Sequence, residues 1–137
     1  MSPSVSVILP CFNHQDYVRD AVNSVLAQTL VDIEVITIDD CSSDATAQIL
    51  EGYDDPRMSL IRHEHNRGSA ETINEGIRRS KAPYVAILNS DDRFHPERLA
   101  QCLDYAQNND SMLMGTDLEL IDDSGELIQD RTSGWID

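Results

Sequence analysis

The residues best suited to chemistry in this sequence are the adjacent aspartates Asp91 and Asp92, in the run Asn89-Ser90-Asp91-Asp92. Carboxylates at this spacing suit a hard divalent cation, Mg²⁺ or Mn²⁺, which takes oxygen ligands and keeps positions for phosphate oxygens. A bound cation also removes the repulsion between the two neighbouring charges. The alternative is that the pair caps the helix that follows.

A second aspartate pair, Asp39 and Asp40, occurs earlier in the chain. A carboxylate in a crevice accepts hydrogen bonds from a base imino group or from ribose hydroxyls. Because successive side chains of an extended segment alternate, we expect one of the two to point into the sheet layer and the other into the crevice. The alternative is that both cap a helix that begins near Ser43.

Three further features fall in loops that follow predicted strands. Phe12 suits stacking on a planar base, with packing beneath the first helix as the alternative. Arg67 precedes Gly68 at the start of a helix, where a cation beside free backbone N–H groups favours phosphate or an acidic loop. His63 and His65 lie two residues apart, but no third ligand is evident, so zinc is not expected.

These loops follow short apolar runs that predict strands, and helical periodicity appears between the runs. Strand and helix alternate four times, which predicts an α/β fold with an open, mainly parallel sheet and helices on both faces. The loops at the carboxyl ends of such strands form the usual ligand crevice. The predicted strands cover residues 4–9, 33–38, 58–61 and 84–88, with helices starting near the caps Asn13, Ser43 and Gly68 and at Pro96.

Towards the carboxyl end, residues 111–116 predict a fifth strand. Residues 118–121 and 126–128 predict a short β-hairpin around the turn-rich tetrapeptide Asp122-Asp-Ser-Gly125.

Composition limits the class of protein. The 137 residues suit one domain, 1–137, and no linker is evident. A net charge of −15, from 25 acidic and 10 basic residues, argues against a nucleic-acid partner. No apolar run approaches the roughly 20 residues of a transmembrane segment, and no signal-peptide pattern is present. Three cysteines without zinc spacing fit a reducing compartment, so we expect a cytoplasmic location.

Four segments resemble, in order, the motifs of glycosyltransferase family 2 enzymes, and the resemblance extends to about Gly125. It implies a GT-A fold, a Rossmann-like sheet that binds a nucleotide diphosphate-sugar. The segments are Ser6-Val-Ile-Leu-Pro-Cys-Phe-Asn13, Ile38-Asp-Asp-Cys-Ser-Ser-Asp-Ala-Thr46, Asn66-Arg-Gly68 with Asn74 and Gly76, and Leu88-Asn-Ser-Asp-Asp92.

The resemblance also implies roles for individual residues. The Pro10 backbone and Phe12 would hold the base, and Asp40 would read its imino edge. Asp92 would bind Mn²⁺ or Mg²⁺ directly, while Asp91 would contact the ribose or reach the metal through water. The metal would bridge the diphosphate and stabilise the leaving nucleoside diphosphate. The nucleotide-binding set is completed by Asn13, Arg67 and Ser90.

Two positions depart from the family pattern. Asn89 stands where the family has the first aspartate of its metal motif, and it offers an oxygen without a charge, so we expect weaker metal binding. Ile73 stands where an arginine is common, which removes a contact to phosphate or base. These departures and the short length favour the alternative of a non-catalytic nucleotide-sugar-binding or regulatory module.

The family places its general base in a carboxy-terminal acceptor half. No carboxylate before the final Gly134-Trp-Ile-Asp137 fits that role, since Asp117, Asp122 and Asp123 are expected in the hairpin or its turn. We therefore expect no catalytic base in residues 1–137, which would be a fragment of an enzyme that transfers sugar, with inversion, to an acceptor hydroxyl.

The resemblance further suggests a glycan or lipid-linked glycan as the acceptor. The full-length protein would then work at the inner face of a membrane. Apolar surface left on the sheet edge would favour a homodimer.

Overall fold

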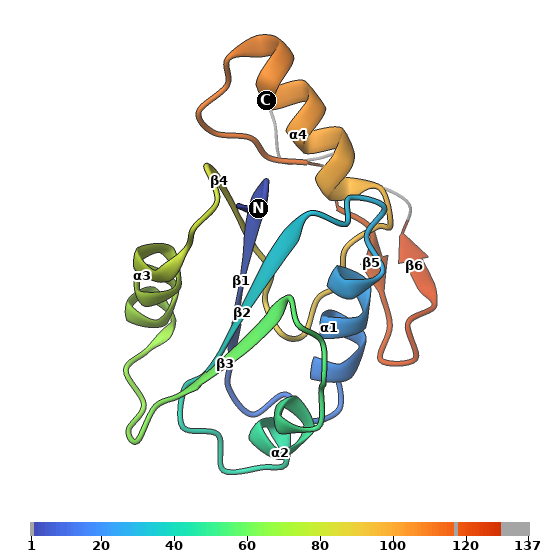
Figure 1. Cartoon of the computed structure of the whole chain (residues 1–137). Helices are drawn as coiled ribbons and strands as arrows, with labels where there is room; N and C mark the ends of the chain where they lie inside the picture. Colours follow the sequence, from blue (N-terminus) through green and yellow to red (C-terminus); the bar gives the residue numbers. More distant parts are fainter. Residues whose placement is uncertain (1, 117, 130–137) are drawn as a thin grey trace. The chain divides into compact units, whose positions relative to one another are not determined.

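The structure is a computed structural model, and it describes residues 2–116 and 118–129 (Figure 1). The chain divides into two compact units, Met1–Tyr105 and Ala106–Asp137. Each unit is described by itself below.

The first unit contains a four-stranded sheet whose neighbouring strands all run parallel. The strand order is β3-β2-β1-β4. β2 and β3 follow β1 on one side of the sheet, and the chain then crosses over to place β4 on the other side of β1. This confirms the predicted parallel α/β sheet. The strands are β1 (Val5–Cys11), β2 (Ile33–Asp39), β3 (Met58–Arg62) and β4 (Tyr84–Ile87).

Helices cover both faces of the sheet, as the alternation predicted. Figure 1 shows α1 (Val18–Leu26) and α2 (Thr46–Glu51) on one side and α3 (Ser69–Arg79) on the other. The fourth helix, α4 (Arg98–Asn109), starts in the first unit.

The core follows from the alternation of side chains along β1 and β2. One face of these strands packs with the buried stripe of α1, and the opposite face forms a smaller cluster around Ile8, Ile36 and Ile38. Gly76 of α3 lies against Ile8 so closely that a methyl group in place of its hydrogen would overlap the Ile8 side chain. The buried stripe of α1 is the predicted one, Val18, Ala21, Val22 and Val25.

Several predicted boundaries are wrong. β1 does not stop before Pro10 but runs to Cys11. Ile8 faces β4 in the ladder, where its carbonyl accepts the Leu88 N–H. Pro10, two residues on, faces the same edge beyond the end of β4, so its missing N–H costs no ladder bond. The strand can therefore include the proline.

The predicted caps also differ from the structure. α1 begins at Val18, and Asn13 lies well before it with a left-handed backbone, φ 50°. α2 begins at Thr46, whose N–H is accepted by the Asp44 carboxylate rather than by Ser43. Gly68 does precede α3 directly, as predicted. The remaining difference is at α4, which begins two residues after Pro96.

β4 is less buried than its sequence indicated. Val85 and Ile87 keep 39% and 44% of their surface exposed, although they lie on the same face of the sheet as Ile8, which packs against α3. Pairing of two chains at this edge stays a prediction.

In the second unit, residues 111–116 form no strand, so the predicted fifth strand is wrong. The hairpin is confirmed: β5 (Leu120–Ile121) pairs antiparallel with β6 (Leu127–Gln129). The Asp122 carboxylate accepts the N–H groups of Ser124 and Glu126 and so closes the turn. Asp117 and the terminal run from Gly134 to Asp137 lie outside the described residues. Within the described residues, no helix combines the length and the apolar character needed to cross a bilayer.

Candidate functional site

Four loops meet at the carboxyl edge of the sheet because the parallel strands end together. The register pairs Cys11 with Asp39 and Asp39 with Arg62, so the loops after β1, β2 and β3 start side by side. β4 ends earlier, at Ile87 paired with Ile8, and the loop after it is joined to the loop after β1 by the contact between His14 and Ser90. Polar residues 77 positions apart in the sequence, such as Asn13 and Ser90, therefore belong to one edge.

The loops after β1 and β2 are fastened together through Asn13. Its Oδ1 accepts the Ser43 N–H at 2.8 Å, and its own N–H donates to Ser42 Oγ at 3.0 Å. Cys41 in the partner loop also has a left-handed backbone, φ 65°, which side chains other than glycine adopt rarely. Such conformations persist where surrounding contacts enforce them, so these two loops are held in one arrangement.

Asp40 does not face an open crevice. Its side chain is 5% exposed, since residues 63–68 fold over it. One carboxylate oxygen contacts His63 Nδ1 at 2.7 Å and accepts the Arg67 N–H at 2.8 Å, and the other accepts the Gly68 N–H at 2.9 Å. Gly68 can point its N–H this way because it adopts φ 84°, a conformation that favours glycine. Both aspartates of the pair are buried, so the carboxylate expected to point into the crevice is covered by residues 63–68.

His63 continues this network away from Asp40. Its Nε2 lies 2.7 Å from Glu75 Oε2, and its ring is only 2% exposed. Burial alone would lower the pKa of His63, but the hydrogen bonds to Asp40 and Glu75 outweigh burial and raise it. The hydrogen bond with His63 Nε2 lowers the pKa of Glu75. At Asp40, the hydrogen bond with His63 Nδ1 and the two backbone donors outweigh burial and lower the pKa. Both ring nitrogens lie 2.7 Å from carboxylate oxygens, and carboxylates only accept hydrogen bonds, so this geometry favours an imidazolium that donates on both sides.

Asp39 lies on the other face of β2 and is 1% exposed. Its Oδ2 accepts the Ser42 N–H at 3.1 Å within the loop after β2, four residues before α2 begins, so this bond does not cap the helix. Its Oδ1 has no hydrogen-bond partner among the described residues. Burial raises the pKa of the neighbouring Cys11 thiol to about 12, a hydrogen bond with Ser90 opposes the rise, and the Asp39 charge adds to it. Cys11 is therefore a neutral thiol and not a nucleophile.

The run Asn89–Asp92, called the aspartate loop below, forms a turn in which the Asp92 N–H donates to the Asn89 carbonyl at 3.1 Å. Ser90 is buried, whereas the residues on either side of it are exposed. Partial desolvation raises the pKa of the Asp92 carboxyl and the Asp91 charge raises it further, while a hydrogen bond with Asn89 and the electrostatic effect of His14 oppose the rise. The loop therefore presents two mutually repelling carboxylates to solvent.

This donor set fits a cation that brings other ligands with it. In the described part of the chain, no cluster of three or more His, Cys, Asp or Glu side chains has metal-binding geometry. Asp91, Asp92 and the Asn89 amide offer oxygen donors, which suit Mg²⁺ or Mn²⁺, and diphosphate oxygens and water would supply the remaining positions. The charge repulsion at Asp92 is what such a cation would relieve.

His14 connects the loop after β1 to the aspartate loop. Its Nδ1 lies 2.7 Å from Ser90 Oγ, and its Nε2 lies 3.9 Å from Asp91 Oδ2. Its backbone N–H donates to Thr46 Oγ1 at 3.0 Å. His14 thus contacts the loops after β1, β2 and β4.

The other predicted site residues lie around the same edge. Phe12 keeps 45% of its surface exposed, an unusual state for a phenylalanine that lies beside a polar crevice. Pro10 precedes it at the end of β1. The Arg67 guanidinium, predicted to contact phosphate, is half exposed and lies 3.5 Å from the Glu75 carboxylate. The guanidinium therefore already has an acidic partner within the chain.

Sequence patterns did not reveal the roles of His14, His63 and Glu75. His63 was considered only as a zinc ligand together with His65, His14 was given no role, and Glu75 has the ordinary appearance of a helix-surface acid. The strand register would have indicated His63, because it follows the residue paired with Asp39 and so lies beside Asp40.

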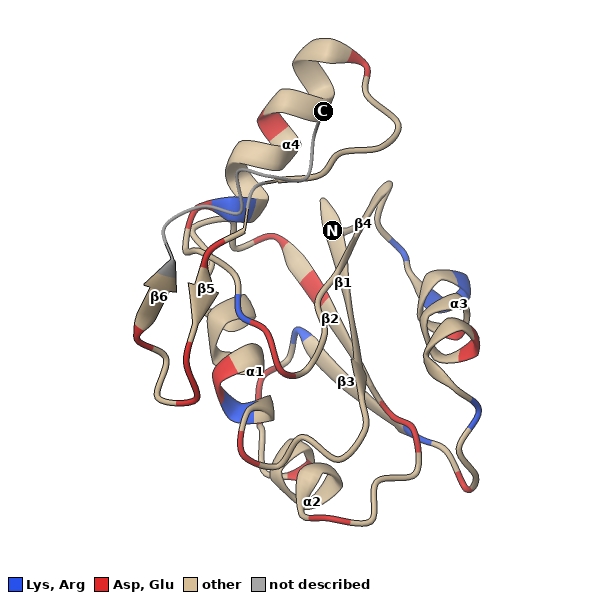
Figure 2. Cartoon of the chain, turned by 180° about the vertical axis from the view of Figure 1, so that it is seen from behind, with Lys and Arg blue, Asp and Glu red and all other residues tan. Residues whose placement is uncertain are grey.

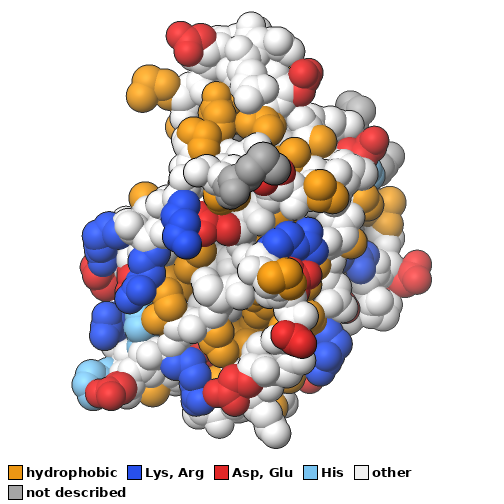
Figure 3. All heavy atoms as spheres, viewed as in Figure 1, with side chains coloured by type: hydrophobic (Ala, Val, Ile, Leu, Met, Phe, Trp, Pro, Cys, Tyr) orange, Lys and Arg blue, Asp and Glu red, His pale blue; other side chains and the backbone are white. Residues whose placement is uncertain are grey.

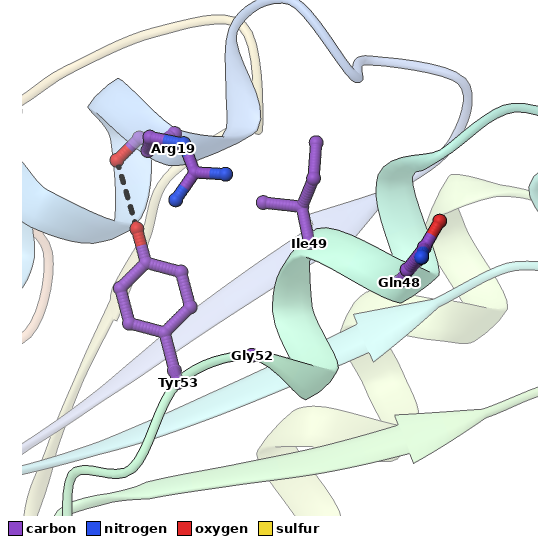
Figure 4. A pocket seen from close by; sticks show the side chains of 5 residues that line it. All are labelled: Arg19, Gln48, Ile49, Gly52 and Tyr53. Carbon is purple, nitrogen blue, oxygen red and sulfur yellow. Dashed lines mark hydrogen bonds between the residues drawn. The ribbon is translucent and has the colours of Figure 1, made fainter.

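A separate hollow of about 290 Å³ lies between α1 and α2. Figure 4 shows Tyr53 reaching across it, and its hydroxyl donates to the Arg19 carbonyl at 3.3 Å. None of the predicted site residues lines this hollow, so it is distinct from the strand-end edge. Its lining residues are Arg19, Gln48, Ile49, Gly52 and Tyr53.

Charged side chains are distributed unevenly over the first unit. Basic side chains gather over α3 (Figure 3), yet α3 carries acidic residues as well (Figure 2). Arg78 contacts Glu71 at 2.8 Å, and Arg79 contacts Glu75 at 3.0 Å. The basic side of the unit is therefore balanced by its own carboxylates.

Comparison with known proteins supports the resemblance found in the sequence. The sequence model of Glycosyl transferase family 2 matches residues 6–131. The glycosyltransferase TuaG of Bacillus subtilis, named for teichuronic acid biosynthesis, is 37% identical over 125 residues, which are 90% of this chain and 50% of TuaG. The succinoglycan biosynthesis protein ExoO of Rhizobium meliloti is 32% identical over 93% of this chain and 36% of ExoO. The chain spans half or less of these relatives.

Solved structures show the same fold. TarS of S. aureus superposes with a TM-score of 0.73 at 25% identity, over 88% of this chain and 24% of TarS. A TarS structure in complex with UDP-GlcNAc superposes with a TM-score of 0.71 at 24% identity, over 88% of this chain and 40% of the TarS chain. A mannosyltransferase from Pyrobaculum calidifontis was solved in complex with GDP-Man and Mn²⁺. It superposes with a TM-score of 0.70 at 23% identity, over 77% of this chain and 33% of the mannosyltransferase chain.

Proposed function

Because the chain belongs to glycosyl transferase family 2, we propose that it is the donor-binding part of a glycosyltransferase, and that it binds a nucleotide diphosphate-sugar through a divalent cation. The observation that carries this proposal is the aspartate loop, which presents Asp91 and Asp92 at the same sheet edge as the exposed ring of Phe12.

The aspartate loop would hold the diphosphate end of the donor. Asp92 is the proposed direct ligand of Mn²⁺ or Mg²⁺, and Asp91 would contact the ribose or reach the metal through water. The cation supplies Lewis-acid stabilisation of the leaving nucleoside diphosphate when it is bound. One of the neighbours with this fold was solved with GDP-Man and Mn²⁺.

The loop after β1 would hold the base. Phe12 offers a partly exposed aromatic face for stacking, and the Pro10 backbone and Asn13 lie beside it. Arg67 and Ser90 complete the proposed nucleotide-binding set.

For Asp40, the contacts favour an indirect contribution. Its oxygens already accept two backbone N–H groups and contact His63. The carboxylate would hold the Arg67-Gly68 segment in place, and a direct contact to a base imino group would require His63 to give up its bond.

The whole protein would transfer the sugar, with inversion, to a hydroxyl of a glycan or lipid-linked glycan. Its general base would lie outside residues 1–137, which span half or less of the relatives compared. A cytoplasmic location at the inner face of a membrane is part of the same proposal.

Calorimetric titration of UDP, GDP and dTDP with and without Mn²⁺ tests the donor site. We expect one nucleotide to bind with an affinity that depends on Mn²⁺. In Asp92→Asn the metal ligand loses its charge, and the metal-dependent part of the affinity should fall at least about tenfold, the cost typical even of losing a residue behind the ligands.

The matched control is Asp54→Asn, the same charge change in the exposed connection between α2 and β3. Its nucleotide affinity should equal that of the wild type. Binding that ignores Mn²⁺, or an equal loss in both variants, would remove the support for this site.

The second candidate is a non-catalytic nucleotide-sugar-binding or regulatory module. The specific observation that favours it is Asn89, which replaces a charged donor in an exposed loop. Sugar transfer or hydrolysis by the full-length protein that disappears in Asp92→Ala would reject this alternative.

A further inference from the structure

The backbone of His14 is fixed at the junction of two loops. Its N–H donates to Thr46 Oγ1, and Thr46 is fully buried. Its carbonyl accepts the N–H groups of Tyr17 and Val18 at 3.0 and 2.8 Å. The imidazole therefore extends from a rigid point.

The imidazole contacts a residue that controls the aspartate loop. Ser90 is 1% exposed, and its hydroxyl lies 2.7 Å from His14 Nδ1. Ser90 is buried between the exposed residues Asn89 and Asp91, so a bond that holds Ser90 restricts the backbone that carries both neighbours.

Both contacts of the ring can be made by one tautomer. With the proton on Nε2, Nδ1 accepts the Ser90 hydroxyl proton, and the N–H on Nε2 is the group nearest to Asp91, 3.9 Å from Oδ2. The first contact has the length of a strong hydrogen bond, whereas the second is beyond it. The Ser90 contact is thus the stronger of the two.

We propose that His14 is a positioning residue for the cation–diphosphate site: its Nδ1 bond to Ser90 fixes the aspartate loop so that Asp91 and Asp92 face the donor. This inference rests on the proposed function. Residues behind metal ligands commonly set their orientation, and their loss costs about 10- to 100-fold in metal affinity.

Two substitutions separate the Ser90 contact from the rest of the ring. His14→Ala removes both contacts. His14→Asn places an amide oxygen close to the position of Nδ1, so it can still accept from Ser90, but it has nothing at the position of Nε2. His65→Ala is the control, because His65 is exposed in a neighbouring loop and takes no part in the proposed site.

The experiment measures Mn²⁺ binding calorimetrically in the presence of UDP or GDP, with thermal unfolding recorded for each variant. We expect His14→Ala to weaken Mn²⁺ binding by about tenfold or more. His14→Asn should stay within about threefold of the wild type, and His65→Ala should not change it.

Two results would overturn the inference. One is Mn²⁺ binding by His14→Ala within twofold of the wild type. The other is an Asn variant as weak as the Ala variant although both unfold at the wild-type temperature. The wild-type titration distinguishes these from failure of the proposed function, which would show as no Mn²⁺-dependent nucleotide binding in any of the four proteins.

Discussion

Replacing His63 with leucine should expose how strongly the buried triad supports the site. The substitution removes the partner of Asp40 at 2.7 Å and of Glu75 at 2.7 Å, and it leaves an apolar side chain between two carboxylates. Removing one member of a buried ion pair costs about 3–5 kcal/mol.

The remaining contacts place the expected cost at the lower end of that range. Asp40 keeps the N–H groups of Arg67 and Gly68, and Glu75 keeps Arg79 at 3.0 Å. We therefore expect a loss of about 3 kcal/mol. This is a large fraction of the roughly 5–15 kcal/mol by which domains are stable. It corresponds to a fall of about 10 °C in melting temperature for a chain of this size.

Urea and thermal unfolding of three variants measure this effect. His63→Asn keeps a donor near Asp40 and should lose less stability than His63→Leu. The control His65→Leu changes an exposed residue and should stay within about 0.5 kcal/mol of the wild type. If His63→Leu loses less than about 1 kcal/mol, the premise that a buried ion pair is costly to break does not apply here.

The same triad gives the stability a defined pH dependence. The folded pKa of His63 is raised, so its contribution is complete below the unfolded pKa of about 6.5 and is lost as pH rises through the folded value. The folded pKa values of Asp40 and Glu75 are lowered, so their contributions are complete above about pH 4.3 and are lost as pH falls through the folded values. The difference between wild type and His63→Leu should therefore peak between about pH 4.3 and 6.5. A difference that grows steadily from pH 6.5 to 9 would contradict the assigned charges.

Two further predictions concern the packing of the helices and strands that support the loops. Gly76→Ala would place a methyl group against Ile8. Overpacking costs about 1–3 kcal/mol and outweighs the gain in helix propensity of about 1 kcal/mol, so chemical denaturation should show a lower free energy of unfolding. A more stable variant would contradict the packing. Gln28→Leu removes the amide that donates to the His95 carbonyl at 2.7 Å and accepts the Leu99 N–H at 3.0 Å. The free energy of unfolding should fall by about 1–3 kcal/mol, and the Leu99 amide should exchange its hydrogen faster with solvent. Unchanged exchange at Leu99 would show that the bond is not formed in solution.

The order and type of the main elements were predictable because each strand and helix carries its own periodic pattern. The buried stripe of α1 and the continuous apolar run of β2 are examples, and both lie in the core. The strand boundary at Pro10 was not predictable from the proline alone, since it depends on where the neighbour β4 ends. The fifth strand at residues 111–116 failed for a related reason, because a short apolar run becomes a strand only with a partner to pair with.

The site was predictable in its location but less so in its contacts. Parallel topology sends all four loops to one edge, and this placed Asp40 and Asp92 at the same edge without further knowledge. The burial of Asp40 could not be read from its own segment, because it results from residues 63–68 that fold over it and from the freedom of Gly68 to adopt φ 84°. Tertiary contacts of this kind override the local alternation of side chains.

Asp40 and the pair Asp91–Asp92 show opposite solutions to the same electrostatic problem. Asp40 is buried and has its charge matched within the chain, by His63 and two backbone donors. Asp91 and Asp92 are exposed, and their mutual repulsion helps to raise the pKa of Asp92. A carboxylate already matched has little to gain from a ligand, whereas an unmatched pair gains stability from a bound cation. By this reasoning a cation would gain more at the loop after β4 than at the end of β2.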